Sequence, residues 1–382
     1  MERILKFFSK EYESISQAAL LLGFFAFLSQ FLGLFRDRAI AYFAPRLTGN
    51  HKVRRMVRDL IAQASRSKKA EPSIKEQLNR TDLSKTAYVD LLRALGANLA
   101  PFATMVAPRV EQMLATEPDW KIRYLLLSPA HRLVKNAPSL ASRISTILHQ
   151  DPNPFVRVEA IRSIEQLERF SEDLLKLTAD SSMRVRQAAT ELLAKDRHPN
   201  ANQVIRTRLT KDSWPEVRAQ AAESLASQPA NPEADNALID ALGDDSWLVR
   251  VKVAETLGVR QSITGGEALT EHFEDSKERI EVRVAAANSL GDLCYEPSVN
   301  ALTKQAQKLK SPGMDLRDRA LSATALGALG RIRPKDLAKR LEPLLSGKDV
   351  PKEIRKAAES ALHSESTCGN ADSAVTAKAP TQ

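Results

Sequence analysis

The chain has 382 residues, of which 43% are apolar and only 5% aromatic, a length that suits two compact domains or one elongated array. The mean hydropathy of −0.31 excludes a transporter with many membrane spans, and the two cysteines, Cys294 and Cys368, exclude a disulfide framework or a cysteine-based zinc site. Of the net charge of +9, residues 36–80 carry +8, so the rest of the chain offers no basic track for nucleic acid.

The N-terminal region contains 22 consecutive uncharged residues, Ser14 to Phe35, which as a helix would cross a bilayer of about 30 Å. A cleaved signal peptide would have a shorter apolar region and a small-residue cleavage site, whereas this run ends in Arg36-Asp37-Arg38. A soluble buried helix is the other alternative. We therefore expect a tail over residues 1–14 and a transmembrane helix over residues 15–43. Four residues are predicted at the membrane interface: Arg36, Arg38, Tyr42 and Phe43.

The same region resembles the first transmembrane helix of the MurJ/MviN lipid II flippase family. The shared pattern is Leu32-Gly33-x-x-Arg36-Asp37, followed by the apolar stretch 39–44. In that family the matching arginine lines the substrate cavity, so Arg36 is the position that the resemblance singles out. The resemblance covers about 30 residues, and nothing after residue 45 supplies a second transmembrane span. Flippase activity of this chain alone is therefore not expected. Shared descent of one piece, docking on a larger membrane protein and convergence all remain open.

Residues 44–81 form a basic segment next to the predicted span, with a flexible break expected at 65–72. Basic residues beside a membrane bind anionic lipid, so residues 36–80 are predicted to contact lipid headgroups. Residues 36–58 carry seven basic residues, against three in residues 1–14. Because Lys and Arg accumulate on the cytoplasmic side, we expect a single-pass protein whose C-terminal part faces the cytoplasm. The flippase resemblance implies the opposite orientation.

From about residue 100 the chain repeats itself. Each unit has an acidic residue, four further residues, Val-Arg or a close variant, and an apolar pattern of helical spacing. Eight copies recur at intervals of 29 to 38 residues. The arginines are Arg123, Arg157, Arg186, Arg218, Arg250, Arg283, Arg317 and Arg355. Between them lie shorter helical patterns, several preceded by proline. A pair of helices cannot cover its own apolar face, so neighbouring pairs must stack.

The repeat resembles the HEAT family, in particular the short bacterial HEAT-like type with the D-x-x-x-x-V-R signature. This predicts an all-α fold: a right-handed α-solenoid of HEAT-like helical pairs over residues 82–363, preceded by one transmembrane helix. Residues 82–99 would form a degenerate first repeat that caps the array. Residues 364–382 are small and polar without periodicity, and they are predicted to be a disordered tail.

The HEAT resemblance also implies a ladder, in which the acidic residue caps the second helix and the arginine reaches an aspartate of an adjacent repeat. The predicted ladder residues are Arg123, Asp151, Arg157, Asp180, Arg186, Asp212, Arg218, Asp244, Arg250, Arg283, Arg317, Asp349 and Arg355. The ladder should be weakest in three copies. They carry Glu117, Lys277 with Glu278, and, in 315–326, no acidic residue at the required place.

No constellation of residues indicates chemistry. The six histidines are scattered, and no second histidine lies at metal-ligand spacing. HEAT-like hydroxylases bind iron through His-Glu pairs, but this chain has only Glu271-His272, in reverse order. Trp214 and Trp247 occupy similar places in two repeats, either marking one surface or covering a turn. We therefore expect no catalytic, cofactor or metal site.

The function expected from these features is that of a membrane-anchored HEAT-repeat scaffold or adaptor that binds a protein partner at the cytoplasmic face of the membrane. One alternative is an accessory subunit of a flippase-like complex of the cell envelope. Another is a nucleic-acid-binding protein of the HEAT-like DNA glycosylase type, which the balanced charge of the repeats disfavours. A third is an enzyme such as a HEAT-like bilin lyase.

Overall fold

The computed structural model describes residues 70–311, 313–347, 350–364 and 368. Several predictions lie outside the described residues: the tail at 1–14, the transmembrane helix at 15–43 with its interface residues Arg36, Arg38, Tyr42 and Phe43, the basic segment up to residue 69, Asp349, and the C-terminal tail at 364–382 apart from residues 364 and 368. In the part of the chain that the structure does describe, no helix is long and apolar enough to cross a membrane.

The described residues fold into helices, without a strand, and form two compact units that divide after Arg208. The first unit contains α4 (Ala70–Asn79), α5 (Lys85–Leu95), α6 (Ala103–Thr116), α7 (Trp120–Leu133), α8 (Ser139–Gln150), α9 (Pro154–Arg162), α10 (Ser171–Leu177) and α11 (Met183–Leu193). Helix α12 (Ala201–Lys211) crosses the boundary between the units. The second contains α13 (Pro215–Leu225), α14 (Pro232–Ala241), α15 (Trp247–Val259), α16 (Gly266–Glu274), α17 (Ile280–Asp292), α18 (Val299–Ala306), α19 (Leu316–Ile332), α20 (Leu337–Leu345) and α21 (Lys352–His363).

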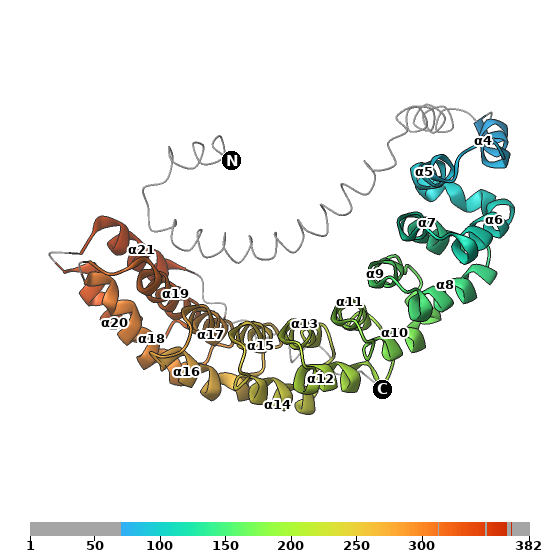
Figure 1. Cartoon of the computed structure of the whole chain (residues 1–382). Coiled ribbons are helices and arrows are strands. Elements are labelled where there is room, and N and C mark those ends of the chain that lie inside the picture. The colour runs from blue at the N-terminus through green and yellow to red at the C-terminus, as the bar shows by residue number, and fades with distance from the viewer. Residues whose placement is uncertain (1–69, 312, 348–349, 365–367, 369–382) are drawn as a thin grey trace, which may run out of the picture. The chain divides into compact units, whose positions relative to one another are not determined.

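Each unit has two layers of helices (Figure 1). In the first unit α5, α7, α9 and α11 stack side by side, and α6, α8 and α10 pack against α7, α9 and α11. In the second unit α13, α15, α17, α19 and α21 form one layer, and α14, α16, α18 and α20 form the other. The all-helical solenoid of helical pairs is therefore confirmed, while its right-handed sense stays a prediction. The flexible break expected at 65–72 is wrong from Ala70 onwards, because α4 begins there.

The second helix of each helical pair, for example α15, carries an apolar stripe that forms the core. In α15, Val249, Val253 and Leu257 have no exposed surface. Small residues let neighbouring helices approach closely: a Cβ on Gly258 would lie only 2.6 Å from the Ser289 hydroxyl of the next second helix. That hydroxyl donates to the carbonyl of Ala254 at 2.8 Å. Close helix contact thus depends on residues without bulky side chains.

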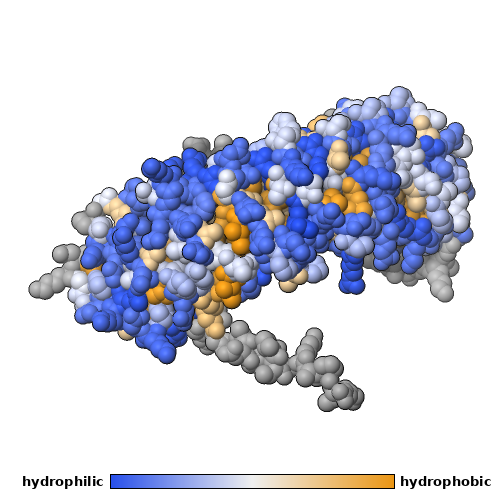
Figure 2. Space-filling model, turned by 90° about the horizontal axis from the view of Figure 1, so that it is seen from below, coloured by the Kyte–Doolittle hydropathy of each residue, from blue (hydrophilic) through white to orange (hydrophobic). Residues whose placement is uncertain are grey.

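The outer surface is mostly hydrophilic, with apolar residues in separate patches on the face seen in Figure 2. Most large apolar side chains of the described residues are buried, and only seven are exposed. These few exceptions are therefore informative about what the surface contacts.

Candidate functional site

The ladder begins in the first unit with two forked ion pairs. Arg123 Nε and Nη2 donate to the two carboxylate oxygens of Asp151 at 2.7 and 3.0 Å. Arg157 repeats this arrangement one helical pair later, with Asp180 at 3.2 and 2.8 Å. In each case Nη1 turns back to the carbonyl of the acidic residue that precedes its own helix, Glu117 at 2.8 Å or Asp151 at 2.6 Å. The planar guanidinium group suits this geometry, because its donors face two directions.

The second unit continues the ladder. Arg218 donates to Asp244 at 2.7 and 2.8 Å and also to Asp245 at 2.7 Å. Arg250 donates to both carboxylate oxygens of Glu278, at 2.8 and 2.6 Å. The expectation of a weak rung at Lys277 and Glu278 is wrong here, because the longer glutamate side chain reaches from one position later in the repeat.

The acidic residues accept hydrogen bonds within the turn that precedes the helix and do not cap the helix themselves, which corrects their predicted role as helix caps. Asp151 accepts from the amide of Asn153 at 2.9 Å, and it is Asn153 that caps α9. Asp244 likewise accepts from the amide of Ser246, the N-cap residue of α15, at 2.9 Å. Each carboxylate therefore fixes the turn that leads into its own helix while it binds the arginine of the preceding repeat.

Neither end of the ladder follows the pattern. Glu117 binds Lys85 at 2.7 Å, so a lysine of the degenerate first repeat stands where later repeats have arginine. Arg283 Nε donates to the carbonyl of Phe273 at 2.9 Å. The Arg317 side chain is exposed, and Arg355 Nη2 donates to the carbonyl of Gly347 at 3.3 Å.

Two predicted ladder residues remain, Arg186 in the first unit and Asp212 in the second. Arg186 Nη1 donates to the carbonyl of Asp180 at 2.9 Å. Asp212 accepts from the amide of Trp214 at 3.0 Å. Asp151, Asp180 and Asp244 each accept in the same way from the amide two residues later in the chain.

Glu278 shows how the ladder changes acidity. Burial of the carboxyl favours the protonated form, but hydrogen bonds from Arg250, the Arg279 amide and His272 outweigh it and lower the pKa of Glu278 to about 2. The carboxylate therefore stays charged at any physiological pH, and the Arg250–Glu278 ion pair holds the two repeats together throughout that range.

The exposed aromatic residues form a second feature, here called the aromatic row. It consists of Trp214 and Trp247 of the second unit, which are 49% and 40% exposed and lie at or next to the first residue of α13 and α15. The first unit has a pair of its own, Trp120 and Phe155, each 36% exposed, at the corresponding places of α7 and α9. In the first unit the rings of Trp120 and Phe155 are 6.2 Å apart between centroids. The two tryptophans singled out in the sequence therefore present their rings at the surface.

An arginine accompanies the exposed aromatic residues in each unit. The Arg184 guanidinium lies 5.5 Å from the centre of the Phe155 ring, and that of Arg279 lies 5.4 Å from the Trp247 ring. Both arginines come from the start of the following second helix or its cap. In each unit an apolar ring thus lies beside a positively charged side chain that the repeat signature does not predict.

His131 belongs to the core. It lies edge-on to the Phe170 ring, with 5.4 Å between centroids. Burial lowers the pKa of His131 to about 4, and a hydrogen bond with the Ala160 backbone opposes this only in part. His131 is thus neutral at pH 7.

His131 should make the protein less stable in mild acid. In the unfolded chain the histidine titrates near pH 6.5, so between about pH 6.5 and 4 the unfolded state binds more protons than the folded state. We expect the free energy of unfolding to fall by about 3 kcal/mol from this group as the pH drops through that range. Urea unfolding of the wild type and of His131→Phe at pH 7 and pH 4.5 measures it. An equal pH dependence in both proteins would contradict this assignment.

The described residues contain no group of three or more His, Cys, Asp or Glu side chains placed to hold a metal ion. His272, of the reversed Glu271-His272 pair, lies with Nδ1 3.0 Å from Glu278 and is part of the ladder. Its nearest acidic partner is thus already bound to Arg250.

Comparison with known families agrees with this geometry. Three overlapping stretches, residues 141–226, 171–258 and 202–280, match the model of HEAT repeats. Within residues 141–280 the helical pairs are therefore HEAT-like repeats. The matches begin in α8 and end at the first residue of α17, and they include both residues of three of the four forked ion pairs described above; Arg123 of the first pair lies before them.

Two curated relatives match parts of the chain. A HEAT repeat-containing taxis protein of Halobacterium salinarum is 33% identical over 132 residues, 30% of this chain and 31% of the relative. Deoxyhypusine hydroxylase of Kluyveromyces lactis is 36% identical over 84 residues, 22% of this chain and 26% of the enzyme. The matches span less than a third of either relative.

Among solved structures, one from a study of Kap95p binding to RanGDP superposes with a TM-score of 0.51 and 12% identity. The superposition covers 77% of this chain and 47% of that one. At this identity the likeness shows the fold alone, a solenoid of helical pairs.

Proposed function

We propose that this protein is a membrane-anchored scaffold that binds a protein partner through the aromatic row. The observation that carries the proposal is the exposure of Trp214 and Trp247 at the same end of successive second helices, with Arg279 beside one of them. Tryptophan and arginine are the residues that most often dominate binding at protein interfaces. A solenoid displays such residues at regular intervals, as an extended partner requires.

The proposal is of a non-enzymatic role, which a fold of HEAT-like repeats suits. The match to a taxis protein is compatible with a repeat array that acts by binding. The match to deoxyhypusine hydroxylase raises the alternative of an iron enzyme. That reading needs His-Glu pairs, and the reversed pair at 271–272 has its histidine engaged with the ladder residue Glu278. Fold similarity by itself does not transfer activity.

The anchoring part of the proposal depends on the uncharged run from Ser14 to Phe35 and the basic residues that follow it. The run is long enough for a transmembrane helix, and the basic segment suits anionic headgroups. The side of the membrane that carries the repeats stays a prediction from the charge bias, and the disulfide described below favours the opposite side.

Photo-crosslinking tests the aromatic row. We expect p-benzoylphenylalanine at Trp214 or Trp247 to form a discrete adduct with one protein after irradiation of cells that contain the full chain. The matched controls are Val259 and Ile263, which are 69% and 64% exposed but lie at the other end of α15 and beyond it. They should give no such adduct. Equal adducts at all four positions, or none at the tryptophans, would refute the aromatic row as the binding surface.

A further inference from the structure

Three residues of the second unit adopt the left-handed backbone conformation without being glycine: Gln261, Cys294 and Arg333, with φ of 56°, 53° and 52°. Each follows a second helix, α15, α17 or α19, at its C-terminal end. Side chains other than glycine and asparagine rarely adopt this conformation at a helix end. A residue kept there by the fold is thus expected to contribute through its side chain.

Two of these side chains join their repeat to the next one. Gln261 Nε2 donates at 3.1 Å to the carbonyl of Asp292, the last residue of α17. Arg333 Nη1 donates at 2.6 Å to the carbonyl of Ser364, the C-cap residue of α21. A second ladder thus runs along the C-terminal ends of these helices, opposite the ends that carry the Arg–carboxylate ladder.

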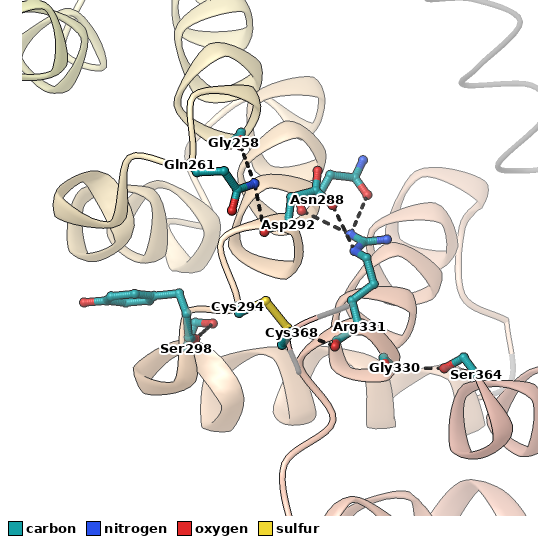
Figure 3. Close-up of a disulfide and its surroundings, with 11 residues drawn as sticks. Gly258, Gln261, Asn288, Asp292, Cys294, Ser298, Gly330, Arg331, Ser364 and Cys368 are labelled. Atoms are coloured by element: carbon teal, nitrogen blue, oxygen red, sulfur yellow. Dashed lines mark hydrogen bonds and ion pairs between the residues drawn. A yellow bond between two sulfur atoms is a disulfide. The ribbon is translucent and has the colours of Figure 1, made fainter. Parts of the chain in front are cut away.

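Cys294 occupies the middle rung of this second ladder, but its side chain is too short to reach α19. It forms a disulfide with Cys368, whose Cα lies 5.7 Å from that of Cys294. The Cys368 sulfur lies 3.1 Å from the carbonyl oxygen of Arg331 in α19 (Figure 3). A disulfide sulfur has no proton to donate, so this is a packing contact. Cys368 therefore supplies the part of the rung that Cys294 lacks.

The surroundings of the disulfide bind the same elements together. Arg331 Nε pairs with Asp292 at 3.1 Å, and Arg331 Nη2 donates to the carbonyl of Asn288 at 3.1 Å (Figure 3). The Ser364 hydroxyl donates to the carbonyl of Gly330 at 3.3 Å. The disulfide thus lies within a set of contacts that join α17, α19 and the end of α21. Cys368 is therefore paired, at a position that the sequence places in a tail predicted to be disordered.

We infer that the Cys294–Cys368 disulfide is a permanent part of the fold and that the repeats lie in an oxidising compartment, outside the cytoplasm. Its formation removes two protons and two electrons from the two thiols. A protein disulfide of a thiol oxidase accepts them and leaves as a dithiol. Such bonds persist in secreted and periplasmic proteins, whereas cytoplasmic thiols are kept reduced. This orientation is opposite to the one that the charge bias predicts.

Thiol trapping tests the redox state. Cells that contain the full chain are quenched in acid, and the denatured protein is treated with a maleimide polymer before or after reduction. We expect no added polymer before reduction and two polymers per chain after it. The single variants Cys294→Ser and Cys368→Ser should each take one polymer without reduction, which shows that both positions react. Two polymers on unreduced wild type would overturn the inference.

Labelling of intact cells tests the compartment separately. Lys356 is exposed on α21, and Lys356→Cys adds one thiol to a chain whose own cysteines are paired. A membrane-impermeant maleimide should label this variant in intact cells to the same extent as in lysed cells. Labelling only after lysis would place the repeats in the cytoplasm and overturn the compartment assignment, whatever partner the aromatic row binds.

Discussion

Replacing Arg123 with Ala should lower the free energy of unfolding of the first unit by about 3–5 kcal/mol, because it leaves a buried carboxylate without its counter-charge. The Asp151 side chain is only 3% exposed and receives two hydrogen bonds from Arg123. After the substitution the amide of Asn153 is its one remaining donor that the structure shows. Urea unfolding at pH 7, followed by circular dichroism, measures the loss.

The matched control is the exposed pair of Arg80 and Asp82, with an N–O distance of 2.6 Å and side chains 39% and 65% exposed. Water screens this pair, so Asp82→Ala should leave the urea midpoint unchanged. If Arg123→Ala also left the midpoint unchanged, the forked pairs would be accessory to the apolar stripe rather than necessary for it. A conservative Arg123→Lys should recover only part of the stability, because lysine cannot donate to both oxygens in a fork.

Loss of the disulfide should have the second large effect, confined to the second unit. Cys294 and Cys368 are 74 residues apart in the sequence. Closing a loop of that length restricts the unfolded chain, and removing the bond costs about 4 kcal/mol in the chain-entropy model. We expect Cys368→Ser to reduce hydrogen-exchange protection in α17 to α21, with α7 to α11 unchanged.

Reduction provides the control for that experiment. A reducing agent should lower the wild type to the stability of Cys368→Ser and should leave the variant itself unchanged. If the variant kept full protection in α17 to α21 under non-reducing conditions, the disulfide would lie on the surface of an already stable unit and would not support it.

The helical pairs could be predicted because their signals are local. An acidic residue and an arginine six positions apart lie around the same turn, and the apolar stripe of α15 follows from one helical period. The partner of each arginine was implied by the HEAT resemblance, and Arg123 and Asp151 do meet. The strength of the rung at Glu278 could not be predicted from its position in the repeat, because the length of the side chain decides whether it reaches Arg250.

The disulfide and the cation of the aromatic row could not be predicted, for a different reason. Cys294 and Cys368 are brought together by the packing of α17, α19 and α21, which no short sequence window contains. Arg279 lies outside the repeat signature, and only the stacking of α15 on α17 places it over Trp247. Residue types with no periodic signal become meaningful only after the repeats have been assembled.

The disulfide also changes how the second unit would respond to a mechanical load. Non-covalent rungs join each repeat only to its neighbour, so every rung of the array bears the tension applied along it. Cys368 is bound to Cys294, and the sequence between them includes α18, α19, α20 and α21. A pull on the chain beyond Cys368 is therefore transmitted through the sulfur–sulfur bond directly to the end of α17. These four helices would bear none of the force while the bond is intact.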